Sequence, residues 1–224
     1  MRYMKTSLIL TLLLGMILSC EESNELPEAT ASLSFAVEQG SLAKAANDHV
    51  ALDSVKILLK TIQFHSVDES DSMDYKSDPQ VVRLDLAGGV NTLSASAIPM
   101  GTYDKVSFRI HKPEDTETPS DPDFKIGDSG NERFSIIAGG THDGQAFLFR
   151  SSKSSKQRVN IDPPLVVEEE GLELNVTLSV DVSTWFIDED GEHLNPLDEG
   201  DENEIDKAIR RSFKGFRDDD RDGS

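Results

Sequence analysis

The segment from Leu172 to Val182 constrains the fold more than any other part of the chain. Six apolar side chains alternate there with five polar ones without a break in phase. Because a β-strand turns successive side chains to opposite faces, this alternation predicts a strand with one buried and one solvent-facing side. We interpret it as the central strand of an antiparallel sheet.

Shorter apolar segments precede this strand and are separated by turn-forming residues; most of them alternate in the same way, and 146–149 has apolar residues on both faces. They lie at 33–37, 55–64, 82–86, 93–97, 106–110, 134–136, 146–149 and 159–161. Within 55–64 the apolar phase changes, which predicts either a β-bulge near Lys60 and Thr61 or two separate strand segments. A total of about eight to ten short strands predicts an all-β fold, an antiparallel β-sandwich of the immunoglobulin-like or transthyretin-like type.

Three segments between these strands are predicted to be turns or loops. Residues 66–79 and 112–132 are acidic and contain serine or proline, so we expect exposed loops. Residues 139–144 begin with two glycines and contain an Asp-Gly pair, which is typical of a turn.

A single short helix is predicted near the C-terminus. Residues 187–206 contain ten acids and no lysine or arginine. Asp201 followed three residues later by Glu204 resembles a capping box. The apolar residues after it share one helical face: Ile205, Ala208, Ile209 and Phe213. Gly215 is the predicted end of this helix, which we expect to pack on the sheet.

Residues 1–19 have the pattern of a secretory signal peptide. Arg2 and Lys5 give a positive start, and residues 8–18 form an apolar core that is shorter than the roughly 20 residues of a membrane span. The core ends in Ser19 and Cys20, which resemble a bacterial lipobox, a small residue followed by the cysteine that is acylated. We therefore predict that lipid on Cys20 holds the protein on a membrane.

The lone cysteine and the net charge exclude several classes of function. Cys20 is the only cysteine, so its acylation leaves no residue for disulfides, cysteine nucleophiles or thiolate metal sites. Removal of residues 1–19 takes away two basic residues and no acid, which leaves 20 basic and 42 acidic residues and a formal charge of −22. Such a surface repels nucleic acid and anionic membranes and favours divalent cations or basic partners.

The chain is long enough for one domain with an appendage. We divide it into a signal peptide (1–19), the acylated cysteine with a tether (20–30), a β-sandwich domain (31–186) and an acidic C-terminal extension with one helix (187–224). Glu21 and Glu22 directly follow Cys20 and resemble the acidic signals that send some Bacteroidetes-type lipoproteins to the outer face of the outer membrane. The expected location is therefore the outer membrane, on the cell surface rather than in the periplasm.

Three stretches, 55–62, 84–86 and 98–106, resemble an uncharacterised β-sandwich domain family of Bacteroidetes-type lipoproteins. In that family a strand leads to a Leu-Asp-Leu-like segment, which matches 84–86, and then to a Pro-x-Gly-x-Tyr turn, which matches 99–103. The stretch from 181 to the Asp-rich end resembles a tail common in these lipoproteins. The resemblance implies a β-sandwich and brings no activity and no functional residues.

The C-terminal residues Asp218, Asp220 and Asp222, followed by Gly223, match the opening of a calcium-binding loop. In such loops alternate carboxylates meet on one hard cation and the glycine permits the bend. The closing bidentate glutamate is absent, so a further ligand would come from elsewhere, such as the acids of 188–206. The alternative is a frayed, charged chain end.

A second acidic group, Asp188, Asp190 and Glu192 around Gly191, is a weaker calcium candidate. The alternative is a solvated turn after a strand. If the fold brings the two acidic segments together, they could share one ion.

No catalytic set of residues is recognisable in the sequence. Residues 127–130 (Gly-Asp-Ser-Gly) resemble the nucleophile motif of chymotrypsin-like proteases, but no upstream histidine stands in the motif that this family requires, so we expect a flexible turn. His65 and His111 lie at strand ends and are expected to face solvent.

We therefore predict that the protein is not an enzyme. The favoured hypothesis is a lipid-anchored envelope protein that binds an unidentified protein or glycan, or has a structural role. Two alternatives stay open. One is a periplasmic accessory domain of an envelope complex, and the other is a hydrolase whose carboxylates meet only in the folded chain.

Overall fold

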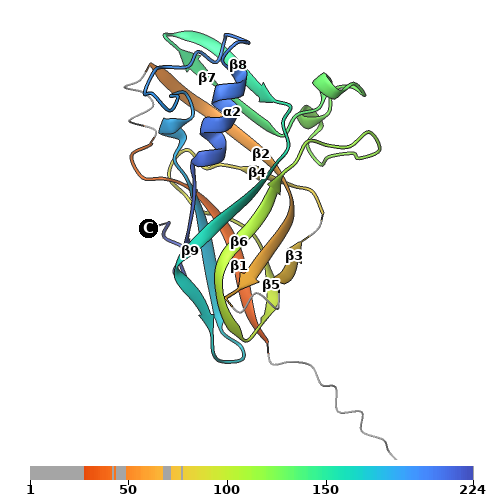
Figure 1. The fold of residues 1–224 in the computed structure, drawn as a ribbon, viewed down its shortest axis with the longest axis vertical. Helices are drawn as coiled ribbons and strands as arrows, with labels where there is room; N and C mark the ends of the chain where they lie inside the picture. The colour runs from red at the N-terminus through yellow and green to blue at the C-terminus, as the bar shows by residue number, and fades with distance from the viewer. Residues whose placement is uncertain (1–27, 42, 44–48, 68–71, 77, 224) are drawn as a thin grey trace, which may run out of the picture.

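The computed structural model describes residues 28–41, 43, 49–67, 72–76 and 78–223 (Figure 1). The signal peptide, Cys20 and the pair Glu21 and Glu22 lie outside the described residues. Most of the described chain is β-structure, and a helix lies near the C-terminus as predicted.

The strands build one large curled sheet (Figure 1). They are β1 (Glu28–Val37), β2 (Val50–Ser66), β3 (Ser72–Lys76), β4 (Gln80–Arg83), β5 (Asn91–Pro99), β6 (Gly101–Ile110), β7 (Ile136–His142), β8 (Gln145–Ser151), β9 (Ser155–Val167), β10 (Glu173–Val180) and β11 (Phe213–Arg217). The sheet order is β5-β1-β10-β11-β9-β6-β2-β7-β8, and β3 and β4 also pair with β2. Three short 3₁₀ helices, η1 (Pro122–Phe124), η2 (Gly130–Glu132) and η3 (Val182–Thr184), and the helix α2 (Glu202–Arg211) complete the set.

The sheet is mixed, which corrects the predicted antiparallel arrangement. β1 runs parallel to β10 over eight paired residues, from Thr30 opposite Glu173 to Val37 opposite Val180. β11 also runs parallel to β9. A parallel pair needs a long crossover connection instead of a hairpin, and β1 and β10 are separated by most of the chain. Alternation within one strand reveals its faces and carries no information on the direction of its partner.

β10 is the strand predicted from 172–182, and it lies inside the sheet between β1 and β11. Its apolar residues face the core as expected. Its polar residues Asn175, Thr177 and Ser179 are also buried, at no more than 7% exposure. The predicted solvent-facing side is covered by residues 218–223, to which Asn175 and Thr177 are hydrogen-bonded.

The hydrophobic core lies within the curl of the sheet. Phe108 of β6 packs edge-to-face on Phe35 of β1, with ring centroids 6.1 Å apart, and on Phe213 of β11 at 5.3 Å. Trp185, just after η3, is fully buried, and its indole N–H donates to the Ser212 hydroxyl at 2.9 Å. Each large apolar side chain buried in this way stabilises the fold by about 1.5–3 kcal/mol.

The bulge predicted in β2 is confirmed. Thr61 and Ile62 lie opposite the single residue Phe108 of β6, and Thr61 has a φ of 55°, in the left-handed region. The extra residue lets Leu59 and Phe64, which have opposite phase in the sequence, both face the core.

The C-terminal extension is part of the sheet. α2 packs through Ile205, Ala208 and Ile209, as predicted, and ends at Arg211, whereas Phe213, predicted on the same helical face, is the first residue of β11. Gly215 is not the end of the helix, because it lies in β11, a strand that the sequence did not predict. β11 occupies the position between β10 and β9 and joins the two parts of the sheet.

Three further boundaries differ from the prediction. Residues 28–30, assigned to the tether, belong to β1, and Ala29 is buried. β3 lies within the segment 66–79, which was predicted to be a loop. The first four residues of the predicted turn 139–144 lie in β7, and the turn itself is Asp143 and Gly144, both with positive φ.

Candidate functional site

A buried polar layer supports the C-terminal aspartates. Its centre is Asn175 of β10, whose Oδ1 accepts hydrogen bonds from the hydroxyls of Ser32 at 2.7 Å and Ser34 at 2.8 Å. The Asn175 side-chain amide donates to Thr177 Oγ1 and to the main-chain oxygen of Asp218, both at 2.9 Å. Because both ends of the Asn175 amide have partners, this polar layer is stable although it is buried.

The Asp218 carboxylate organises the loop that follows β11. The Thr177 hydroxyl donates to Asp218 Oδ2 at 2.6 Å, and the Gly223 N–H donates to the same oxygen at 3.2 Å. Asp218 Oδ1 accepts from the Asp222 N–H at 3.1 Å. Gly223 has a φ of 84°, a conformation that glycine adopts at no steric cost. The last residues therefore fold back around a carboxylate that is itself buried.

Asp218, Asp220 and Asp222 form a compact group of carboxylates. One oxygen from each residue lies within 4.8 Å of the others, and no other group of three potential metal ligands occurs in the part of the chain that the structure describes. Calcium binds oxygen at about 2.3–2.6 Å, so oxygens of one coordination sphere are at most about 5 Å apart. The fold thus brings together the three acids that the sequence singled out, with a spacing that fits this ion.

The second acidic group forms a turn. Asp188 Oδ1 accepts hydrogen bonds from the N–H groups of Asp190 at 2.9 Å and Glu192 at 2.8 Å, and Gly191 has a φ of 86°. Asp188, Asp190 and Glu192 are not among the carboxylates that lie close to Asp218, Asp220 and Asp222. Calcium binding at 188–192 and an ion shared by the two segments stay predictions.

Ion pairs fix the acidic segment 112–132 to the sheet. The Asp121 side chain is only 6% exposed and lies 2.9 Å from Lys56 Nζ and 2.5 Å from an Arg83 nitrogen. Burial opposes its ionisation, but the Lys56 ammonium and the Asp123 N–H outweigh burial and hold the pKa of Asp121 below its usual value. The neighbouring Phe124 is fully buried.

A partly buried His–Glu–Lys cluster was not predicted from the sequence. His111, expected to face solvent, is 1% exposed, and its Nε2 lies 2.5 Å from Glu117 Oε2. Lys60 Nζ donates to Glu117 Oε1 at 2.5 Å, and the Glu114 N–H donates to Oε2 at 2.8 Å. Burial raises the pKa of Glu117, but Lys60, the Glu114 N–H and His111 outweigh it and hold the pKa at about 2. No local pattern reveals this cluster, because Lys60 comes from a distant strand.

The serine motif at 127–130 is part of a turn, as expected. The Ser129 hydroxyl bonds to Glu132 Oε2 at 2.8 Å and to the Asn131 side chain.

The three buried acids of the described residues lie on different elements. A glycoside hydrolase uses two carboxylates that face each other across the substrate. The buried acids of the described residues are Asp121, Asp206 and Asp218, and they lie on a loop, a helix and the C-terminal loop with separate partners.

Comparison with known proteins assigns no family to this chain. No protein-family model matches the sequence, and no curated protein is significantly similar to it. Among solved structures, the chain is similar to MbnP from Methylosinus trichosporium, with 9% identity, a TM-score of 0.41, and coverage of 71% of this chain and 76% of that chain. A similarity at this level carries no inference about activity. Within the described residues, no helix has the length and apolar character to span a membrane.

Proposed function

We propose that the protein is an outer-membrane lipoprotein, anchored through lipid on Cys20, whose β-domain is a non-catalytic binding or structural module. The observation that supports the anchor is the lone cysteine, which follows an apolar core and the small residue Ser19. The first strand, β1, begins at Glu28, eight residues after Cys20. An extended chain spans at most about 3.3–3.6 Å per residue, so β1 begins within about 30 Å of the acylated cysteine. A partner of this domain is therefore to be sought at the membrane surface.

The acidic pair Glu21 and Glu22 favours the cell surface over the periplasm, and the resemblance to Bacteroidetes-type lipoproteins favours the same location. A periplasmic accessory domain is the alternative that uses the same anchor. The unidentified partner is a protein or a glycan in either case.

Metabolic labelling with an alkyne analogue of palmitate tests the anchor. Wild type is expected to carry the label and to sediment with membranes, and Cys20→Ser is expected to lose the label and to become soluble. Ser19→Ala is the matched control, because alanine keeps a small residue before the cysteine and should preserve labelling. A soluble, unlabelled wild-type protein would overturn the proposal.

We further propose that the group Asp218, Asp220 and Asp222 binds one calcium ion as a structural cofactor. Three carboxylates this close repel one another, and a divalent cation between them removes that cost. Asp218 is already positioned by Thr177. Water or a main-chain oxygen supplies the remaining ligands, as in other calcium sites.

We also propose that the sheet is a variant of a β-sandwich. The portion β5-β1-β10-β11 then faces the portion β9-β6-β2-β7-β8, with the contact of Phe35 and Phe108 between them. Within the first portion, β1 and β10 pair in parallel. An experimental structure in which these two portions do not face each other would contradict this description.

A further inference from the structure

Cations gather on the outer face of β2, β6 and β9, although the chain has a formal charge of −20. The strand register places nine residues in three rows: Lys60, Arg109 and Lys156; Gln63, Ser107 and Arg158; His65, Lys105 and Asn160. Residues that are directly paired across an antiparallel ladder point to the same side of the sheet. Five of these nine positions are lysine or arginine and none is acidic. We call these nine residues the basic face.

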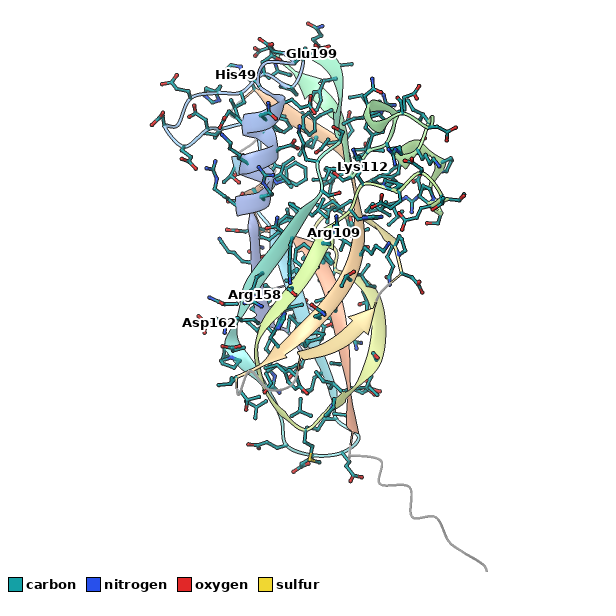
Figure 2. The ribbon with its side chains drawn as sticks, turned by 45° about the vertical axis from the view of Figure 1, so that its right-hand side comes forward. His49, Arg109, Lys112, Arg158, Asp162 and Glu199 are labelled. Carbon is teal, nitrogen blue, oxygen red and sulfur yellow. The ribbon has the colours of Figure 1, made fainter. Side chains whose placement is uncertain are left out.

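Three cations of the basic face are available to a ligand. Lys60 pairs with Glu117 and Lys105 with Asp104, each at 2.5 Å. The side chains of Arg109, Lys156 and Arg158 are exposed and form no hydrogen bond or ion pair with any residue that the structure describes. Figure 2 shows Arg109 and Arg158 on β6 and β9, along the flank of the molecule.

His65 reports the positive potential of this face. Its Nε2 lies 2.7 Å from the Ser107 hydroxyl. Burial lowers the pKa of His65, and Arg158, Lys156 and Lys105 lower it further, while the nearby Asp104 opposes them. Lys105 therefore still disfavours the protonated form of His65, although Lys105 is paired with Asp104.

A hollow of about 350 Å³ opens within the basic face. It lies beside Arg109 and Lys156, where the bulge at Thr61 interrupts the pairing of β2 with β6. Hydroxyl and amide groups also line it, from Thr61, Gln63, Ser154 and Ser155. Bulges of this kind often shape binding sites, because they re-aim side chains and part the strands.

We propose that the basic face binds an acidic oligosaccharide, a short sugar chain that carries carboxylate or sulfate groups. This inference rests on the proposed binding role and names the ligand class for it. Same-face positions of a sheet are spaced about 4.8 Å across the strands and about 6.7 Å along them, so side chains from neighbouring positions can contact successive acidic groups. The neutral hydroxyl and amide groups of the hollow suit the hydroxyl groups of a sugar.

Other partners fit the basic face less well. None of its nine positions holds one of the large exposed apolar residues, whereas the centre of a protein interface carries aromatic or aliphatic anchors. No aromatic ring is present among the nine besides His65, whereas single-stranded nucleic acid stacks on such rings.

The net negative charge limits the ligand to a short one. The sequence alone argued against polyanionic partners, because the mean surface charge repels them. At physiological ionic strength, charges more than about 8 Å apart are largely screened, so a small anion on the basic face is attracted mainly by its immediate neighbours. A long polyanion would also contact the acidic surface around the face.

Titration of the mature, acylated protein in nonionic detergent with a galacturonic acid hexasaccharide and a heparin-derived hexasaccharide tests the proposal. The two probes separate carboxylate from sulfate recognition, and maltohexaose is the neutral control. We expect saturable binding of at least one acidic probe, weakening as salt rises, and none of maltohexaose. The triple change Arg109→Ala, Lys156→Ala and Arg158→Ala should weaken binding about tenfold or more, because three charge-assisted contacts are lost.

The matched control removes the same charge elsewhere. Lys207→Ala, Arg211→Ala and Lys214→Ala remove three exposed cations from α2 and β11 and should change the affinity by less than about twofold, since they act only through screened charge. Absence of binding by both acidic probes, or an equal loss in both triple variants, overturns the proposal. A second experiment modifies exposed lysines with an amine-reactive reagent. If phosphatidylglycerol vesicles protect Lys156 from this reagent and neither acidic oligosaccharide binds, the face binds lipid and the proposal is wrong. Palmitate labelling is unaffected by these outcomes, so the anchor and the ligand are tested separately.

Discussion

Gly140 occupies a position in β7 that has no room for a side chain. A Cβ added there would lie 2.0 Å from the main-chain oxygen of Ala51 and 3.0 Å from the Leu52 Cα. Both are backbone atoms of β2, which cannot move without disturbing its pairing with β7. Gly140→Ala is therefore expected to destabilise the protein by about 2–3 kcal/mol, measured by urea unfolding.

Gly139 supplies the matched control. A Cβ at Gly139 would lie 3.0 Å from Ser54 Oγ, a side-chain atom that can rotate away. Gly139→Ala should cost less than about 1 kcal/mol. Equal losses for the two variants would contradict the explanation. In the sequence both glycines indicate a turn, and only the paired strands reveal the close approach at Gly140.

Glu117 is expected to make stability depend on pH. Its pKa is about 2 in the folded protein and near 4.5 when unfolded, so the native state binds the proton less tightly. The stability from ionised Glu117 is then present above about pH 4.5 and is lost as the pH falls toward 2. Glu117→Gln should lower the free energy of unfolding by about 1–3 kcal/mol at pH 7, and this deficit should shrink below pH 4.5.

Urea unfolding of wild type and Glu117→Gln between pH 7 and pH 3 measures this effect. Glu114→Gln is the control, because the Glu114 side chain is exposed and only its main-chain N–H contacts Glu117. A deficit that stays constant with pH would mean that Glu117 acts through packing instead of charge.

The C-terminal loop is the element that calcium is expected to stabilise. At a free calcium concentration 100 times the dissociation constant, binding to the native state adds about 2.7 kcal/mol, which raises the melting temperature by about 5–10 °C in a chain of this size. Thermal melts of the mature protein with calcium and with a chelator measure this shift.

The variants for this test keep Asp218, because its buried carboxylate also accepts a hydrogen bond from Thr177 and its replacement would destabilise the fold. Asp220→Asn combined with Asp222→Asn should abolish the calcium shift. Asp53→Asn combined with Asp128→Asn removes two exposed acids outside both acidic groups and should leave the shift unchanged. Equal melts with calcium and with chelator would end the calcium proposal.

Elements that bury a regular pattern of their own apolar side chains were predictable from the sequence. The strand β10, the bulge at Thr61 and the helix α2 follow from local apolar periodicity. β11 was not, because it is five residues long and carries a glycine in its middle. A Cβ at Gly215 would lie 2.9 Å from the Asn160 main-chain oxygen. The close approach of β9 therefore requires glycine at this position, although glycine has a low propensity for β-strands.

Of the two candidate sites, one was predictable from the sequence and the other was not. The aspartates of 218–222 are close in sequence, and their spacing alone predicted that they meet. The basic face was not predicted, because its cations come from three strands that are distant in sequence and its charge is hidden in a total of −20. Net charge describes the whole molecule, whereas a ligand is attracted mainly by the charges within a Debye length.

At the scale of the whole molecule, the central claim is that the lipid on Cys20 holds the β-domain at the outer face of the outer membrane. Protease treatment of intact cells that express an epitope-tagged protein tests this claim most directly, with a periplasmic protein as the control for lysis. The account predicts that the tagged protein is digested while the periplasmic control stays intact. Protection of the tagged protein until the cells are lysed would contradict surface exposure and place the domain in the periplasm.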